Sequence, residues 1–182
     1  MPRFSVVNGA TEGGRIADMR EKSDGIATPI IRPYEAGDAA ALRRIFYSAV
    51  HQTASADYTP RQCAAWAPAE YDAALWAEKC ARRRPIVASI GGQCAGYSDL
   101  QPDGLIDHFY VAGAFARRGV GRALMAEIER LARASDRTEL YSHVSLTAEP
   151  FFAKFGFTVE RRQLVEVRGE TLANALMRKR LR

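Results

Sequence analysis

Residues 109–124, FYVAGAFARRGVGRAL, decide the fold. The stretch begins with aromatic and β-branched residues typical of a strand, continues through a basic loop that contains glycine, and ends in apolar residues at helical spacing. The first backbone N–H groups of a helix have no partner within the helix and carry the positive end of its dipole. A strand, a glycine-containing loop and a helix in this order therefore predict a cradle for linked phosphate groups.

Five residues of this loop carry the phosphate-binding prediction. Gly119 and Gly121 let a ligand approach the backbone closely, because they have no side chain. Positive charge comes from Arg117, Arg118 and Arg122. The loop is not a Walker A loop, because no Gly-Lys-Ser/Thr is present, and it is not a GxGxxG fingerprint, because it has only one Gly-x-Gly pair. An ordinary strand–helix loop with exposed arginines is the alternative that these residues alone leave open.

The wider pattern predicts the element order β-ααα-βββ-α-β-α-ββ. A short strand in PIIRPYE (29–35) precedes a helix capped by Asp38, and residues 59–62 form a capping box for the second helix. The pair Gly91-Gly92 predicts a hairpin turn. Hairpins pair strands antiparallel, whereas strand–helix–strand connections pair them parallel. We therefore expect an α/β (α+β) fold whose mixed sheet has about seven strands flanked by helices.

The composition is that of one globular domain. Of the 182 residues, 47% are apolar and 26% are charged, which suffices for a core. Residues 1–27 are polar and turn-rich and predict a flexible tail, whereas residues 28–182 form the domain. No stretch reaches the ~20 apolar residues that span a bilayer, and no secretory leader is recognisable, so we expect a cytoplasmic protein without membrane contact. Metal-ligand spacing is lacking at Cys63, Cys80 and Cys94, so no metal site is predicted.

The positive charge is mostly arginine. The net charge of +5 makes a basic nucleic-acid-binding module an alternative reading. Such a module interleaves aromatic and basic residues along one surface, but the runs RRR (82–84) and RKRLR (178–182) contain no aromatic residue. We therefore expect solvated surface charge and do not expect nucleic acid as a partner.

Three motifs in order resemble the GNAT superfamily of N-acetyltransferases. Residues 116–121, ARRGVG, resemble the family's [Q/R]-x-x-G-x-[G/A] at the strand–helix loop. Residues 148–157, AEPFFAKFGF, resemble its C-terminal A-x-x-F-Y-x-K-x-G-F signature, and residues 31–46 resemble its first strand and helix. The resemblance covers about residues 29–181 and extends to small bacterial members. It implies the splayed sheet of a GNAT-like acyl-CoA N-acyltransferase fold, with acetyl-CoA as cosubstrate between the diverging central strands.

The resemblance also implies which residues hold acetyl-CoA. Backbone groups of Phe109 and Val111 would pair with the pantetheine arm like an added strand, and the amides of residues 117–122 would hold the pyrophosphate. The full implied set is Phe109, Tyr110, Val111, Arg117, Arg118, Gly119, Val120, Gly121, Arg122, Ser145, Phe152 and Lys154. Two positions depart from the family pattern. Ala116 stands where members have Gln or Arg, and Phe152 stands where many have the tyrosine that protonates the departing thiolate.

Two residues are candidates for the base that such a reaction needs, because an amine must lose a proton before it attacks. Asp107 precedes the loop, and strand alternation predicts it on one face with Phe109 and Val111. Its carboxylate is the first candidate to hold the amine and accept the proton; an ion pair with a nearby arginine is the structural alternative. His143 is the second candidate, because histidine titrates near neutral pH.

The sequence therefore predicts an N-acetyltransferase that moves the acetyl group of acetyl-CoA to a primary amine by direct attack in a ternary complex. The amine belongs to a small molecule or to a protein or peptide. A catalytically silent acyl-CoA-binding protein is the alternative that Phe152 supports. Tyr58, Tyr97 and Tyr141 are open candidates for the missing acid. Exposed sheet edges also allow a homodimer.

Overall fold

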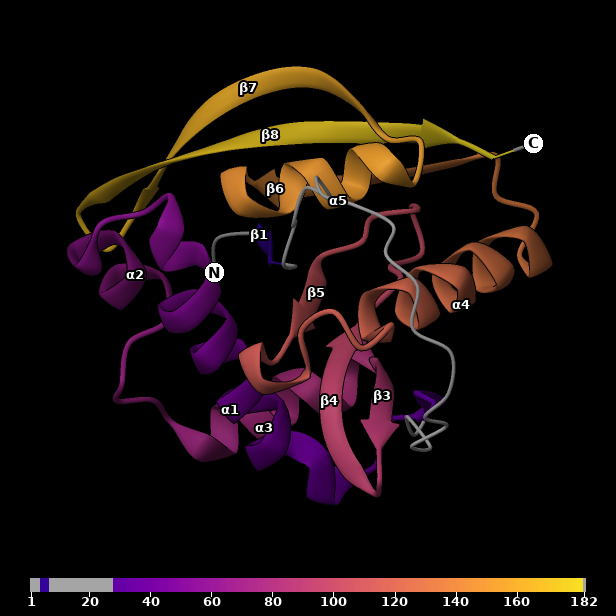
Figure 1. The fold of residues 1–182 in the computed structure, drawn as a ribbon, viewed down its shortest axis with the longest axis horizontal. Helices are drawn as coiled ribbons and strands as arrows, with labels where there is room; N and C mark the ends of the chain where they lie inside the picture. Colours follow the sequence, from indigo (N-terminus) through magenta and orange to yellow (C-terminus); the bar gives the residue numbers. More distant parts are fainter. Residues whose placement is uncertain (1–3, 7–27, 182) are drawn as a thin grey trace, which may run out of the picture.

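The central feature of the computed structural model is one mixed sheet (Figure 1). The structure describes residues 4–6 and 28–181, and the order of the strands among them is β2-β3-β4-β5-β1-β6-β8-β7. The strands are β1 (Phe4–Val6), β2 (Ile30–Pro33), β3 (Ile86–Ile90), β4 (Gln93–Ser98), β5 (His108–Val111), β6 (Glu139–Ser145), β7 (Thr158–Val167) and β8 (Glu170–Arg180).

Strand pairing changes direction across the sheet. The strands β2 to β5 pair antiparallel, β1 pairs parallel with both β5 and β6, and β6, β8 and β7 again pair antiparallel. The predicted mixed sheet is thus confirmed, and the seven expected strands are β2 to β8. The eighth strand, β1, was not expected, because residues 1–27 were predicted as a tail. The rest of that predicted tail lies outside the described residues.

Helices cover both faces of the sheet. They are α1 (Ala39–Ser48), α2 (Pro60–Trp66), α3 (Ala73–Arg83), α4 (Val120–Ala134) and α5 (Glu149–Lys154), with short helical turns η1 (Ala36–Asp38), η2 (Ala49–Thr53), η3 (Ala54–Ala56), η4 (Gly113–Phe115) and η5 (Leu146–Ala148). The capping box at the start of α2 is confirmed: Thr59 Oγ1 accepts from the Gln62 amide, and Gln62 Oε1 accepts from the Thr59 amide.

Asp38 does not cap α1, contrary to the sequence prediction. Its backbone is already helical, and its side chain makes no cap bond to α1. The carboxylate instead pairs with Arg32 at 2.7 Å and accepts from the Glu35 amide at 2.8 Å. The Arg32 hydrogen bonds, acting against burial, lower the pKa of Asp38. Asp38 therefore ties β2 to the start of the first helix.

Each face of the sheet has its own apolar core. The first core holds side chains of α1 to α3 against sheet residues such as Tyr97 and Tyr110. The second core holds side chains of α4 and α5 against sheet residues such as Phe109 and Leu140. Neighbouring residues of β5 therefore point into different cores, as strand alternation requires.

The sheet divides between β5 and β6. Residues 104–106, just before β5, contact β6. The Ile106 amide donates to Tyr141 O at 2.8 Å, and the Tyr141 amide donates to Gly104 O at 3.1 Å. Further along they separate, and β1 lies between them, with Ser5 level with both Phe109 and Val144. The slot between β5 and β6 is therefore the place where a short strand, β1, joins the two halves of the sheet.

Candidate functional site

A cavity of about 470 Å³ lies at the loop between β5 and α4. It collects many of the predicted cofactor residues: Val111, Arg117, Gly119, Val120, Gly121, Arg122 and Lys154. It is also lined by residues that the sequence analysis did not select: Phe115, Ala116, Phe151 and Phe155. The loop, the start of α4 and one face of α5 thus enclose a single site.

The loop backbone has an unusual conformation at two positions. Arg117 has a φ of 62° and Gly119 has a φ of 79°. A left-handed backbone suits glycine but is uncommon for arginine, and such outliers concentrate at binding sites. Turns that contain left-handed residues also direct successive N–H groups into one concavity, which is the geometry of an anion-binding nest. The loop conformation therefore supports the predicted phosphate cradle.

The start of α4 presents amide groups to the cavity. Gly119 is the N-cap residue and, within the described part of the chain, no side chain caps the helix. The first intrahelical bond runs from the Ala123 amide to Gly119 O at 3.0 Å, so the amides of residues 120–122 have no partner within the helix. The charged residues that line the cavity are Arg117, Arg122 and Lys154, all cations. Amides, helix dipole and side chains together favour an anion.

Gly96 of β4 brings this helix start close to the sheet. A Cβ atom at Gly96 would lie 2.8 Å from Val120 Cγ1 and 2.9 Å from Tyr110 O. Contacts this short are not tolerated, so only glycine allows the first turn of α4 to pack here. Gly96 thus positions the 117–122 loop, although it is not among the residues that line the cavity.

Aromatic rings of α5 form one wall, but not with the expected residue. Phe151 and Phe155 line the cavity, with ring centroids 4.8 Å apart. Phe152 is fully buried in the second core, and its ring centroid lies 5.6 Å from that of Phe109. Residues four apart share a helix face, whereas the next residue is turned about 100° away. The spacing of Phe151 and Phe155 is the sequence signal that would have selected them.

The remaining predicted cofactor residues lie around the cavity rather than in its wall. The Tyr110 ring points into the first core, 4.9 Å from the Phe46 ring, and burial raises its pKa. Ser145 Oγ accepts from the Ala148 amide at 3.2 Å and so caps η5. The Arg118 guanidinium lies over the Phe115 ring, 5.3 Å from its centroid.

The outer edge of β5 faces the slot. Ala112 donates its amide to Ala95 O of β4 at 2.9 Å, and His108 O accepts from the Asp99 amide at 3.1 Å. Backbone groups of neighbouring residues in a strand point to opposite edges. The backbone groups of Phe109 and Val111 therefore point away from β4, toward the slot, as the expected pairing with a pantetheine arm requires.

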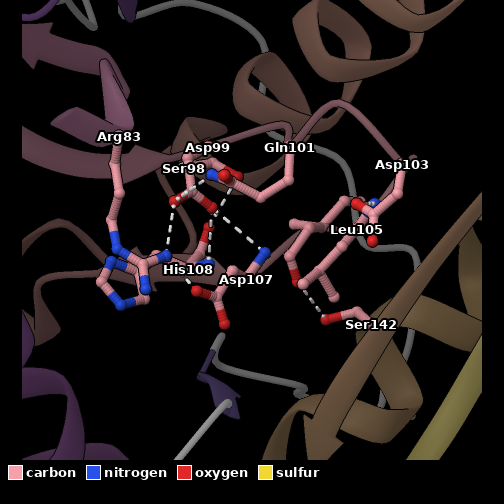
Figure 2. Close-up of polar contacts among 10 residues, drawn as sticks. Arg83, Ser98, Asp99, Gln101, Asp103, Leu105, Asp107, His108 and Ser142 are labelled. Carbon is pink, nitrogen blue, oxygen red and sulfur yellow. Dashed lines mark hydrogen bonds and ion pairs between the residues drawn. The ribbon is translucent and has the colours of Figure 1, made fainter. Parts of the chain in front are cut away.

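Asp107 forms an ion pair rather than standing free (Figure 2). Arg83 of α3 contacts the Asp107 carboxylate, and its guanidinium also lies 3.1 Å from Asp99 Oδ2. Burial would lower the pKa of Arg83, but the charges of Asp107 and Asp99 outweigh that effect and raise it. The ion pair with a nearby arginine, which was the alternative to a role of Asp107 as the base, is therefore present.

A break in the strand explains why Asp107 does not share a face with Phe109. Asp99 Oδ1 accepts from the amides of both Asp107, at 3.1 Å, and His108, at 2.8 Å (Figure 2). Consecutive amides of a regular strand cannot point the same way, so the backbone is bulged here. Asp107 consequently reaches Arg83 on α3, the helix that packs in the first core, whereas Phe109 lies in the second. Alternation counted along the sequence fails at this bulge.

His143 lies on the other side of the slot. Its Nδ1 is 2.7 Å from Gln163 Nε2 of β7. Because Ser5 is level with both Phe109 and Val144, β1 separates β5 from β6 at this height by two strand spacings, roughly 10 Å. The structure therefore places Asp107 and His143 on opposite borders of the slot.

Of the three tyrosines considered as acids, Tyr58 lies nearest the end of β6. Its hydroxyl donates to Ala173 O at 2.6 Å and accepts from the Leu146 amide at 3.0 Å. Burial raises its pKa to about 12, so it is a phenol at neutral pH. Tyr97 is buried in the first core, and the Tyr141 hydroxyl donates to Asp103.

Three residues of the basic runs noted in the sequence pair with carboxylates. Arg83 of the first run pairs with the two aspartates described above. In the second run, Arg178 pairs with Glu139 and Glu160, and Lys179 pairs with Glu129. These pairs support the interpretation of surface charge. Among the described residues, no helix has the length and apolar character needed to cross a bilayer.

Comparison with known proteins places this geometry in a family. A family model described as an acetyltransferase (GNAT) domain matches residues 54–180. The uncharacterized N-acetyltransferase YafP of Escherichia coli (strain K12) is 38% identical over 148 residues, which cover 81% of this chain and 93% of YafP.

Solved structures show the same fold. A GCN5-related N-acetyltransferase from Rhodopseudomonas palustris superposes with a TM-score of 0.81 at 35% identity, over 85% of this chain and 97% of that one. The structure of yncA from Salmonella typhimurium with its cofactor acetyl-CoA has a TM-score of 0.65 at 21% identity, over 85% and 95% of the two chains, and bears on the fold alone. The chain belongs to the GNAT family of N-acetyltransferases.

Proposed function

We propose that this protein transfers the acetyl group of acetyl-CoA to a primary amine by direct attack in a ternary complex. The observation that carries the proposal is the cavity beside the 117–122 loop, where amides at the start of α4 meet the side chains of Arg117, Arg122 and Lys154. A diphosphate is the ligand that such a cradle favours. Family membership supplies the identity of the diphosphate carrier, coenzyme A.

The cofactor residues divide by the part of acetyl-CoA that each would hold. The loop amides and the three cations would bind the pyrophosphate. The outward-facing backbone groups of Phe109 and Val111 would pair with the pantetheine arm. Phe151 and Phe155 would pack against the carrier from α5. The thioester would then reach the slot between β5 and β6, where proximity to the amine supplies much of the rate enhancement.

Asp107 and His143 remain the candidates for handling the amine proton. The Asp107 carboxylate would attract an ammonium group, although Arg83 already shares that charge. His143 stands across the slot, where its Nδ1 lies 2.7 Å from Gln163 Nε2. We expect Asp107→Asn to lower kcat more than the affinity for acetyl-CoA. The same two quantities measured in His143→Gln test the second candidate. Unchanged turnover in Asp107→Asn would remove that carboxylate from the mechanism.

A silent acyl-CoA-binding protein is the second candidate function. Phe152 has no hydroxyl and is fully buried, so it cannot protonate the departing thiolate. Solvent or a tyrosine hydroxyl, such as that of Tyr58, would have to do so in an active enzyme. The two functions differ in whether an amine releases free CoA.

Thiol release from acetyl-CoA, measured with a panel of peptides, polyamines, amino acids and aminoglycosides, tests the proposal. We expect at least one amine to release CoA, and Arg122→Ala to raise the KM for acetyl-CoA. Arg130→Ala is the control, because Arg130 lies on the same helix but pairs with Glu127 on the exposed surface. Binding of acetyl-CoA without release by any amine would instead identify the silent binding protein.

A further inference from the structure

The slot between β5 and β6 contains a strand from the start of the chain. Phe4–Val6 pairs parallel with β5, with Phe4 level with His108, Ser5 with Phe109 and Val6 with Tyr110. On its other side Ser5 is level with Val144 of β6. Figure 1 shows β1 between β5 and β6. A strand with partners on both sides is part of the sheet, although these residues come more than a hundred positions before β5.

The strand β1 uses the same edge of β5 that the acyl carrier needs. The backbone groups of Phe109 point toward the slot, and β1 is the neighbour that they meet there. The paired register of β1 ends at Tyr110, one residue before Val111, which lines the phosphate cavity. The slot is therefore a direct continuation of that cavity along the β5 edge.

We propose that the slot is a strand-binding site with two alternative occupants, residues 4–6 of the chain itself and the thioester arm of acetyl-CoA. One row of backbone donors and acceptors cannot pair with two partners at once, so the N-terminal segment competes with the cosubstrate. The proposal rests on the proposed function for the identity of the second occupant.

The balance between the occupants follows from strand length and covalent attachment. A three-residue strand offers few hydrogen bonds and is easily displaced. Attachment to the same chain, however, gives it an effective concentration of about millimolar order. A site that is partly filled by its own chain binds an external ligand more weakly, by the fraction of molecules in which the site is open. The N-terminal segment thus raises the apparent Kd for acetyl-CoA without contacting the phosphates.

Hydrogen exchange on the full-length protein, with and without CoA, tests the competition directly. We expect CoA to slow exchange at the amides of residues 117–122 and to speed exchange at those of residues 4–6, because the ligand releases β1. Faster exchange on ligand binding is not expected for a segment that merely stabilises the fold. Slower exchange at the loop together with unchanged or slower exchange at residues 4–6 would overturn the competition while leaving cofactor binding intact. Unchanged exchange at both residues 117–122 and residues 4–6 would overturn the competition and the proposed binding of CoA together.

A substitution within β1 provides the second test. Ser5→Pro removes a backbone donor and cannot be accommodated in a central strand, whereas Ser23→Pro introduces the same residue outside β1. Calorimetric titration with CoA should give a Kd several-fold lower for Ser5→Pro than for the wild type, and an unchanged Kd for Ser23→Pro. An equal or weaker affinity in a folded Ser5→Pro protein would contradict the proposal. If Ser5→Pro does not fold, the exchange measurement on the unmodified chain decides.

Discussion

At the scale of single residues, Asp99 fixes the backbone where the sheet divides. One oxygen of this fully buried carboxylate accepts the amides of Asp107 and His108, and the other meets Arg83 and Gln101 Nε2 at 3.1 and 3.0 Å. A buried carboxylate with this many donors compensates for its own desolvation and sets the bulge before β5. Figure 2 shows these contacts converging from α3, the β4–β5 loop and β5 itself.

Asp99→Asn should lower the free energy of unfolding by about 1–3 kcal/mol, because an amide cannot accept from all these donors and leaves Arg83 less well compensated. Urea denaturation measures the change. Glu127→Gln, at an exposed pair with Arg130, is the control and should change stability by less than about 0.5 kcal/mol. A variant Asp99→Asn as stable as the wild type would mean that the bulge is held by other contacts.

His108 predicts how stability depends on pH. Its imidazole packs against the rings of Trp76, Tyr97 and Tyr110, and this desolvation lowers its pKa from the ordinary value. The unfolded chain, with a histidine pKa of about 6.5, therefore binds more protons than the folded chain below neutral pH. Stability should fall as the pH decreases from about 7 toward 5, above the range where carboxylates titrate. The slope should be smaller in His108→Asn, and an identical slope would contradict this assignment.

At the scale of elements, the approach of α4 to β4 determines where the 117–122 loop lies. Gly96→Ala would force a methyl group against Val120 and the Tyr110 carbonyl, so the first turn of α4 must move. We expect a loss of about 1–3 kcal/mol in stability and a weaker affinity for CoA. Gly37→Ala is the matched control, since a Cβ atom there meets nothing within 4 Å. Equal effects in the two variants would show that the packing of α4 is not limiting.

Elements with local signals could be predicted from the sequence. The capping box of Thr59 and Gln62, the Gly91-Gly92 hairpin and the glycine loop before α4 all depend on neighbouring residues, and the structure has each of them. The strand β1 could not be predicted, because three residues have no period and their pairing is entirely with distant strands. Asp107 was misplaced for a similar reason: the bulge beside it depends on Asp99, eight residues earlier.

The site shows the same division between local and non-local signals. The residues that contribute backbone amides or charge at the loop were selected from sequence, because the loop is contiguous. Phe151 and Phe155 were missed in favour of Phe152, because the family pattern points to one position and helix geometry to another. Which side chain of α5 faces the cavity depends on how the helix is rotated against the sheet, and that is decided by the second core.

At the scale of the whole molecule, binding and folding are linked. A ligand that binds only the folded state adds RT ln(1 + [L]/Kd) to its stability, about 2.7 kcal/mol at a hundredfold excess over Kd. Acetyl-CoA should therefore raise the melting temperature of the full chain by several degrees. Free pantetheine, which lacks the pyrophosphate, should raise it much less. Equal shifts with both ligands would place the binding energy outside the phosphate cradle.

Calorimetric titration of CoA into the wild type and into Arg122→Glu tests the central claim most directly. Arg122 is exposed in the first turn of α4, where a glutamate suits the helix dipole, so the variant should remain folded while it repels phosphate. Arg130→Glu changes the net charge equally at a distance from the cavity. We predict one-to-one binding of CoA in the wild type and in Arg130→Glu. In Arg122→Glu the Kd should be at least about tenfold higher, which corresponds to about 1.4 kcal/mol of binding free energy. No binding to the wild type, or equal affinity in all three proteins, would contradict the account.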